Sequence, residues 1–273
     1  MEILLFVVFV MILFVVIESI IELRSFKVTK YTIKTDKIEQ TYKIAMLSDL
    51  HNRKYDFENL SIYGAIDNMA PNIVFIAGDM INNDLELKAG NTLPLIKKIA
   101  EKYKVVYVFG NHEQKMQDKL VDYIEDLKKS GVIFLENEMI SENNINIYGL
   151  KIGQEFYRKF IDKPMNEEYV ENLIGKPDKE KYNIVIAHNP VYFKKYAEWG
   201  SDLVLSGHMH GGFMSLPLIR GVVSPQIIIF PRYSCGLYQR KESKLIVSRG
   251  IGSHTVNIRV FNKPEIVLVE IIN

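Results

Sequence analysis

The segment KIAMLSDLH, residues 43–51, shows the pattern that decides the fold of this chain. A short apolar run of strand-forming residues stops at a motif that carries an aspartate and a histidine, Asp49 and His51. We expect each such run to be a strand that ends at its polar motif. The pattern recurs at Ile73 to Ala77 before Gly78-Asp79, Val105 to Phe109 before Gly110-Asn111-His112, Ile184 to Ala187 before His188, and Leu203 to Leu205 before Gly207-His208-Met209-His210.

Helical spacing fills the intervals between these runs. Apolar residues recur at helical intervals from Leu60 to Met69, from Leu93 to Ile99 and from Leu120 to Leu127, and Gly131 is a typical helix stop. Strands that alternate with helices predict an α/β fold with helices on the faces of mostly parallel or mixed sheets. In such sheets ligands bind beyond the carboxyl ends of the strands, where the polar motifs lie.

The last third of the sequence is rich in β-forming residues. We expect strands at Gln226 to Phe230, Leu245 to Ser248, Val256 to Val260 and Ile266 to Ile271. They predict a second, partly antiparallel sheet packed on the first, with the very apolar Ile266 to Ile272 as a central strand. The expected architecture is therefore two packed mixed β-sheets flanked by helices, an αββα sandwich.

Charge and cysteine content exclude several classes of protein. The 34 basic and 33 acidic residues are nearly balanced, and we find no basic stripe of the kind that a nucleic-acid binder needs. Cys235 is the only cysteine, so the chain can form neither an intrachain disulfide nor a zinc site built on several thiolates. We interpret Cys235 as a buried, unreactive residue.

The N-terminus carries an uninterrupted apolar run of 15 residues, Ile3 to Ile17, followed by Glu18 and Glu22. Residues 1–23 reach the roughly 20 residues of a membrane span if the glutamates lie near an interface. No Lys or Arg precedes the run, and Ser19-Ile20-Ile21 is a poor cleavage site, so we favour a retained anchor over a cleaved signal or a buried helix.

We expect three regions along the chain: the anchor at residues 1–23, a linker and edge strand at 24–42, and one domain at 43–273. Five basic residues follow the apolar run, which slightly favours a cytoplasmic domain attached to the cell membrane. They are Arg24, Lys27, Lys30, Lys34 and Lys37.

The five motifs, taken in order from Asp49 to His210, closely resemble those of the calcineurin-like metallophosphoesterases. The stretches Ser-Asp-Leu-His, Ala-His-Asn-Pro and Ser-Arg-Gly-Ile-Gly are similar to the compact bacterial membrane-associated branch of that family. The resemblance implies that Asp49, His51 and His210 hold one metal ion and that Asn111, His188 and His208 hold a second. It implies further that Asp79 bridges the two. Imidazole, amide and carboxylate ligands suit manganese, iron or zinc.

His112 receives a different role from the resemblance. It would protonate the leaving group or stabilise the transition state, oriented by an acidic partner that the sequence does not identify, although Glu113 is adjacent. Arg249 and Tyr238 could reach the pocket from the second sheet, but we favour packing or surface roles for both. We also interpret His254, outside the motifs, as a surface or structural residue.

The resemblance implies a dinuclear metal-dependent phosphoesterase at the membrane. It would hydrolyse a phosphate monoester or diester by attack of a hydroxide that bridges two metals. A lipid-linked or nucleotide-linked phosphoester fits such a site, and the sequence predicts no nucleic-acid partner. Two alternatives are a non-catalytic scaffold that retains this fold and a membrane-facing binder of lipid headgroups. The protein partners of such an enzyme are not predicted.

Overall fold

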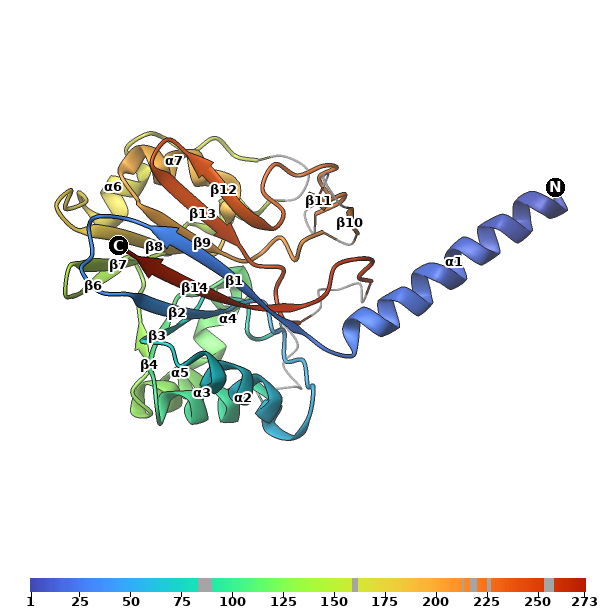
Figure 1. Ribbon diagram of the computed structural model, residues 1–273, viewed down its shortest axis with the longest axis horizontal. Helices are drawn as coiled ribbons and strands as arrows, with labels where there is room; N and C mark the ends of the chain where they lie inside the picture. The colour runs from blue at the N-terminus through green and yellow to red at the C-terminus, as the bar shows by residue number, and fades with distance from the viewer. Residues whose placement is uncertain (83–89, 159–161, 213, 217–219, 225–226, 253–257) are drawn as a thin grey trace.

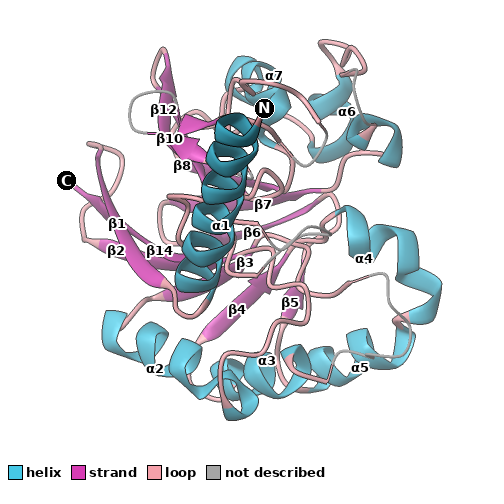
Figure 2. Ribbon diagram, turned by 90° about the vertical axis from the view of Figure 1, so that its right-hand side faces the viewer, coloured by secondary structure: helices cyan, strands magenta, loops and turns pink. Residues whose placement is uncertain are grey.

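The computed structural model describes residues 1–273 except 83–89, 159–161, 213, 217–219, 225–226 and 253–257. Two six-stranded mixed sheets pack face to face, and helices cover their outer faces (Figure 1). The predicted αββα sandwich is confirmed. A single helix, α1 (Glu2–Leu23), projects from this domain (Figures 1 and 2).

The first sheet has the strand order β1-β14-β2-β3-β4-β5. Its strands are β1 (Lys27–Lys34), β14 (Glu265–Ile272), β2 (Tyr42–Leu47), β3 (Ile73–Ile76), β4 (Lys104–Tyr107) and β5 (Ile133–Phe134). The strands β2 to β5 are parallel, and β14 runs antiparallel to β2 and parallel to β1. Strands β14, β2, β3 and β4 are covered on both faces, so their sequences are mostly continuous apolar runs, whereas the edge strand β1 alternates.

Helices α2 (Leu60–Met69), α3 (Thr92–Ala100) and α5 (Val121–Lys129) cover the outer face of this sheet, where the helical spacing predicted them. Their buried side chains, such as Ile66 and Leu95, share one apolar cluster with the outward side chains of the strands. The chain turns after α5 at Gly131, whose φ of +88° lies in the region that favours glycine.

The second sheet has the order β12-β13-β9-β8-β7-β6. Its strands are β12 (Gly236–Arg240), β13 (Ser243–Val247), β9 (Leu203–Ser206), β8 (Tyr182–Ala187), β7 (Ile145–Leu150) and β6 (Glu138–Glu142). Helices α6 (Tyr169–Ile174) and α7 (Phe193–Trp199) pack on its outer face. The remaining elements are the short helix α4 (Asn111–Met116), the 3-10 turns η1 (Phe57–Asn59), η2 (Gln117–Lys119), η3 (Gln154–Tyr157) and η4 (Pro190–Tyr192), and the hairpin of β10 (Ser215–Leu216) and β11 (Arg220–Gly221).

The sequence predicts that the last third of the chain forms the second sheet. The structure differs, because only β12 and β13 of this region belong to that sheet. The second sheet is built mainly from β6 to β9, and the C-terminal strand β14 returns to the first sheet, one place from its edge rather than at its centre. Residues 227–230 and 258–260 contribute isolated bridges, Val223 with Ile229 and Met214 with Val260. The other residues predicted for these two strands, 226 and 256–257, lie outside the described residues.

The two sheets meet across an apolar interior. Side chains of β2, β3, β8, β9 and β14 form this layer, and Val269 of β14 lies opposite Ile44 in register and is fully buried. On the neighbouring edge strand β1, Val28 is exposed to solvent.

Val269→Ala should lower the free energy of unfolding by about 2 kcal/mol, because it removes two buried methyl groups and leaves a cavity. Val28→Ala is the matched control on the adjacent strand and should change the stability by less than about 0.5 kcal/mol. Urea denaturation of both variants tests this. Equal losses would show that the inter-sheet layer does not dominate the core.

Candidate metal centre

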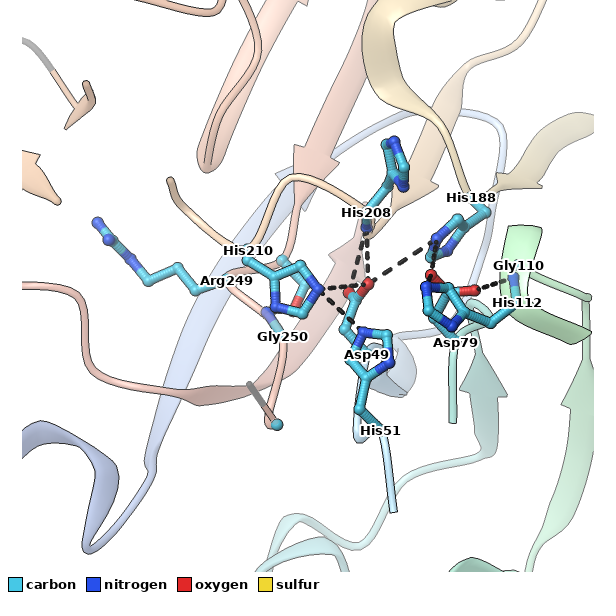
Figure 3. A network of polar contacts seen from close by, with 12 residues as sticks. Asp49, His51, Asp79, Gly110, His112, His188, His208, His210, Arg249 and Gly250 are labelled. Carbon is cyan, nitrogen blue, oxygen red and sulfur yellow. Dashed lines mark hydrogen bonds and ion pairs between the residues drawn. The ribbon is translucent and has the colours of Figure 1, made fainter. Parts of the chain in front are cut away.

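The five predicted motifs meet where the two sheets face each other at the carboxyl ends of their strands (Figure 3). Asp49 and His51 follow β2, Asp79 follows β3, and Asn111 follows β4 in the first sheet. From the second sheet, His188 follows β8, and His208 and His210 follow β9. Neither sheet alone can assemble the cluster, so the packing of the two sheets creates the site.

One group of possible metal ligands consists of Asp49, His51 and His210, whose ligand atoms lie within 4.8 Å of one another. The Nε2 atoms of His51 and His210 are 3.1 Å apart, and His210 Nε2 is 3.4 Å from Asp49 Oδ1. All three residues are buried. Three nitrogen and oxygen donors that converge in this way form a suitable cradle for a divalent cation.

A second group consists of Asp79, His188 and His208, and it adjoins the first. His188 Nε2 lies 3.1 Å from Asp79 Oδ2 and 3.8 Å from Asp49 Oδ1, so this ring faces the carboxylates of both groups. The backbone N–H of His208 donates to both oxygens of Asp49, at 3.0 and 3.2 Å. The geometry is that of a two-centre site rather than two separate sites.

His188 is oriented by the first sheet. Its Nδ1 donates to the backbone carbonyl of Ala77, at 2.6 Å, which leaves Nε2 facing the carboxylates. Burial lowers the pKa of this imidazole, but Asp79 and Asp49 raise it further, to about 10. Without a cation, therefore, a proton on His188 balances the carboxylates. A bound metal would replace that proton, because a ligating histidine must be neutral at the coordinating nitrogen.

The two aspartates respond differently to their surroundings. Burial raises the pKa of Asp49 to about 6. Asp79 is equally buried, yet the neighbouring His188 holds the pKa of its carboxyl well below the usual range. A cation between these side chains would compensate the negative charge that both must carry as ligands.

Five of the seven predicted ligands have left-handed backbone conformations. Their φ angles are 55° at Asp49, 50° at His51, 54° at Asp79, 68° at His208 and 50° at His210. Residues other than glycine rarely adopt this region, and each instance costs on the order of 1–3 kcal/mol. Such strain gathered at one place is characteristic of a functional site.

Gly110 and Gly207 allow the close approach of the loops. A Cβ atom at Gly110 would lie 2.1 Å from Asp79 Oδ1, and one at Gly207 would lie 2.4 Å from Asp49 Oδ2. Any side chain at either position would displace a carboxylate of the cluster. The glycines of the motifs are therefore part of the site, not only of its turns.

Asn111 is the first residue of α4, and its side chain is buried. Its Oδ1 atom accepts no hydrogen bond within the described part of the chain. A buried amide oxygen without a donor is energetically costly, and a cation would satisfy it. The donor set and this oxygen atom thus fit a pair of metal ions.

His112 lies beside the cluster without belonging to either group. Its backbone N–H donates to Asp79 Oδ1 at 2.8 Å, its Nε2 is 3.9 Å from Asp79 Oδ2, and its ring is packed edge-to-face against His51 at 4.8 Å between centroids. Burial lowers the pKa of His112. The imidazole is therefore neutral at physiological pH and carries a single N–H.

Glu113 does not orient His112, although the two are adjacent in sequence. Its buried carboxylate accepts from the backbone N–H groups of Asp79 and Met80 at 2.8 and 2.7 Å, from Gly110 N at 3.0 Å and from the Tyr107 hydroxyl at 2.8 Å. Burial raises the pKa of Glu113 to about 7, which these donors oppose. The side chain clamps together the loops after β3 and β4. A glutamate at the third position of a helix whose N-cap is glycine is the signal for this role.

Arg259 and Asn262 were not predicted, and both support the His210 loop. The guanidinium of Arg259 is buried, donates to the carbonyls of Arg249 and Gly252 at 2.7 Å each, and lies 3.5 Å from His210 Nδ1. Asn262 Nδ2 donates to the carbonyl of His210 at 2.7 Å. Burial lowers the pKa of Arg259 to about 10, which leaves it charged at neutral pH.

Residues from the second sheet contribute less than their positions suggested. The Arg249 side chain extends away from the cluster (Figure 3) and donates to Asn262 Oδ1 at 2.7 Å. Tyr238 accepts from Ser234 N and Cys235 N and stacks edge-to-face on Tyr233.

Tyr157 was not predicted, and its ring packs against His208 with centroids 5.1 Å apart. His254 lies outside the described residues, and Cys235 is buried.

The family model of the calcineurin-like phosphoesterases matches residues 42–212, a span that contains every candidate ligand. The uncharacterized metallophosphoesterase YkuE of Bacillus subtilis (strain 168) is 26% identical over 246 residues, which cover 87% of this chain and 82% of the relative. Phosphodiesterase YaeI of Escherichia coli (strain K12) is 27% identical over 237 residues, covering 85% and 82%. The solved 5′-nucleotidase precursor from Thermus thermophilus aligns with a TM-score of 0.45 and 13% identity over 77% of this chain and 49% of its own.

Glu113→Gln should destabilise the metal-free protein by about 2–4 kcal/mol, because the amide group would face two backbone N–H donors that it cannot accept from. Urea denaturation measures the loss. Glu101→Gln, on an exposed residue after α3, is the matched control and should have little effect. A neutral Glu113→Gln variant would contradict the clamp.

Proposed function

This chain belongs to the calcineurin-like phosphoesterase family, and we propose that it is a membrane-tethered hydrolase that cleaves a phosphodiester with two divalent metal ions bound. The observation that carries the proposal is the pair of adjoining buried groups, Asp49-His51-His210 and Asp79-His188-His208. A family match together with two complete ligand groups supports a dinuclear metal-dependent phosphoesterase.

We assign Asp49, His51 and His210 to one ion and His188, His208 and Asn111 to the other. Asp79 is proposed to bridge the two ions. Its Oδ2 faces His188, and its Oδ1 accepts from the backbone N–H of His112, which holds the carboxylate between the two groups. The ligands are imidazole, carboxylate and amide oxygen, which suit manganese, iron or zinc. When bound, two such ions lower the pKa of coordinated water and stabilise the charge on a transferring phosphoryl group.

The charges of the site favour an anionic substrate. Two divalent ions bring four positive charges, and the two aspartates return two. The buried Arg259 adds a further positive charge behind His210. A phosphodiester carries one negative charge, so its approach to this site is electrostatically favourable.

His112 is proposed to act on the leaving oxygen. It lies beside Asp79 and His51, one residue from each ligand group, and the N–H of its neutral imidazole can donate a hydrogen bond to the leaving oxygen as the ester bond breaks, without transferring its proton. The backbone bond from His112 N to Asp79 holds this ring in a constant position relative to the proposed bridging carboxylate.

The substrate is proposed to be a diester rather than a monoester because the Escherichia coli relative is named a phosphodiesterase. The helix α1 favours a lipid-linked substrate over a soluble nucleotide-linked one, since an anchored enzyme remains close to substrates within the bilayer. The rival function is a non-catalytic scaffold, and such a scaffold does not need a complete set of metal ligands. Here all six ligating His and Asp residues, and His112 beside them, occupy one site.

The helix α1 is proposed to be the tether. It is the one helix among the described residues that is long and apolar enough to cross a membrane, and most of it makes no contact with the domain. The basic residues after it favour a cytoplasmic domain. The narrower resemblance to the membrane-associated branch of the family stays a prediction.

Asp79→Asn should abolish turnover of a generic aryl phosphodiester and reduce the metal content below two ions per chain, because the amide cannot supply a charged bridge. His112→Ala should lower kcat by about 10²–10⁴ while metal content is retained. Steady-state kinetics and metal analysis of protein loaded with manganese, iron or zinc measure both effects.

Asp126→Asn on α5, where the partly exposed carboxylate pairs with Lys97, is the control for these variants and should leave turnover and metal content unchanged. Full turnover in Asp79→Asn, or a wild-type protein that binds no metal, would refute the hydrolase and favour the scaffold.

The double variant Val7→Lys/Met11→Lys should release the protein from membranes in alkaline carbonate, because each lysine costs about 2.5–3.5 kcal/mol at the centre of a spanning helix. The wild type and Val7→Ala/Met11→Ala should remain in the membrane pellet. Sequencing of the N-terminus checks that the helix is retained, and a chain that begins beyond residue 17 would exclude the tether.

A further inference from the structure

The segment that leads into β14 has an unusual distribution of exposure. Ile258 and Phe261 are 39% and 51% exposed, whereas Arg259 and Asn262 between and after them are 2% and 0% exposed. A segment that faces water buries its apolar side chains and exposes its charged ones. Apart from Val260, which is buried, this segment does the reverse, which is the pattern expected of a surface that faces lipid.

The same segment lies against α1. The backbone N–H of Arg259 donates to the Ser19 hydroxyl at 3.2 Å, and the ring of Phe261 packs against that of Phe14 with centroids 6.1 Å apart. A further contact fixes the end of the helix to the domain, from the Arg53 guanidinium to the carbonyl of Leu23. The depth of Phe261 relative to the helix is therefore defined.

Phe14 belongs to the uninterrupted apolar run Ile3 to Ile17. In a helix this run is about 22 Å long, which is shorter than the roughly 30 Å of a bilayer core. A spanning α1 therefore places the whole run in the hydrocarbon, and local thinning of the bilayer accommodates the difference in length. Phe14 would lie inside the membrane, and so would the Phe261 ring beside it.

We propose that Ile258 and Phe261 form a wedge that inserts into the bilayer beside α1 and holds the metal centre at the membrane surface. Two features agree with this. Lys263 follows the wedge and Arg24 follows α1, as basic residues do where apolar segments enter a membrane. A further exposed apolar residue, Phe230, lies near the wedge. Val260 forms a β-bridge with Met214, and the carbonyl of Met214 accepts from the N–H of Val222. The carbonyl of Val222 in turn accepts from the N–H of Phe230.

The wedge is joined directly to the catalytic loops. Its outward residues alternate with Arg259 and Asn262, which bind the carbonyls of Gly252 and His210. One segment thus carries both the proposed membrane contact and the support of a proposed metal ligand. A phosphodiester in the headgroup layer would meet the site without leaving the bilayer. This inference deepens the proposed function and rests on its tether.

The test measures membrane depth in the full-length chain. Single variants Phe261→Cys, Ile258→Cys, Phe9→Cys and Met139→Cys are labelled with an environment-sensitive dye and reconstituted in vesicles of phosphatidylcholine and phosphatidylglycerol. Cys235 is buried, and the unsubstituted chain reports the background labelling. Phe9 is the reference inside α1. Met139 is the matched control, because it is an exposed apolar residue on β6, on the side of the domain away from α1 (Figure 1).

The dye at 261 should be at least about five-fold less accessible to aqueous iodide than the dye at 139, and nitroxide lipids labelled near the glycerol backbone should quench it. Position 258 should behave in the same way and carries the test if the 261 variant does not fold. Iodide quenching at 258 and 261 equal to that at 139, with position 9 protected, would overturn the wedge and leave the tether. Quenching at position 9 as well would overturn both, while turnover of a soluble diester would still report on the hydrolase.

Discussion

Two carboxylates buried next to each other are the constraint on which the rest of this structure depends. Asp49 and Asp79 end neighbouring parallel strands and have almost no solvent contact. Buried charge of one sign is unstable unless positive charge is supplied. His188 reaches the pair from the second sheet and lies within 4 Å of both. The two sheets must therefore pack face to face with their strand ends aligned, and a pair of cations would replace the proton that His188 otherwise holds.

The supports around this pair explain how a strained site can persist. Five of the proposed ligands adopt left-handed backbone conformations, which the surrounding structure must enforce. The Glu113 carboxylate binds the loops after β3 and β4 through three backbone N–H groups, and Arg259 and Asn262 bind the carbonyls of the loops from the second sheet. Rigid supports of this kind keep the ligands in place before a metal binds, which reduces the cost of ordering them on binding.

The position of α1 links this centre to the proposed membrane anchor. Arg259 contacts both Ser19 of the helix and His210. The end of the proposed tether is therefore separated from a proposed metal ligand by a single residue. A tether attached by a long linker would leave the orientation of the active site free. Here the contacts at Phe14, Ser19 and Leu23 hold α1 against the domain, on the side of the site where Arg259 supports His210.

The strand runs, the helices between them and the candidate ligands could be read from the sequence because each rests on a local pattern. Apolar runs that end at Asp, Asn or His do not depend on distant residues, and Gly131 marks a helix end by its own backbone freedom. The pairing of the last third could not be predicted in this way. The strands that β14 pairs with and the role of Glu113 are set by residues far away along the chain. The exposure of Phe261 depends on which face of its loop the rest of the domain covers. The sequence by itself determined which side chains can bind metal, and only the tertiary structure decided which meet, because proximity across two sheets depends on packing and not on spacing along the chain.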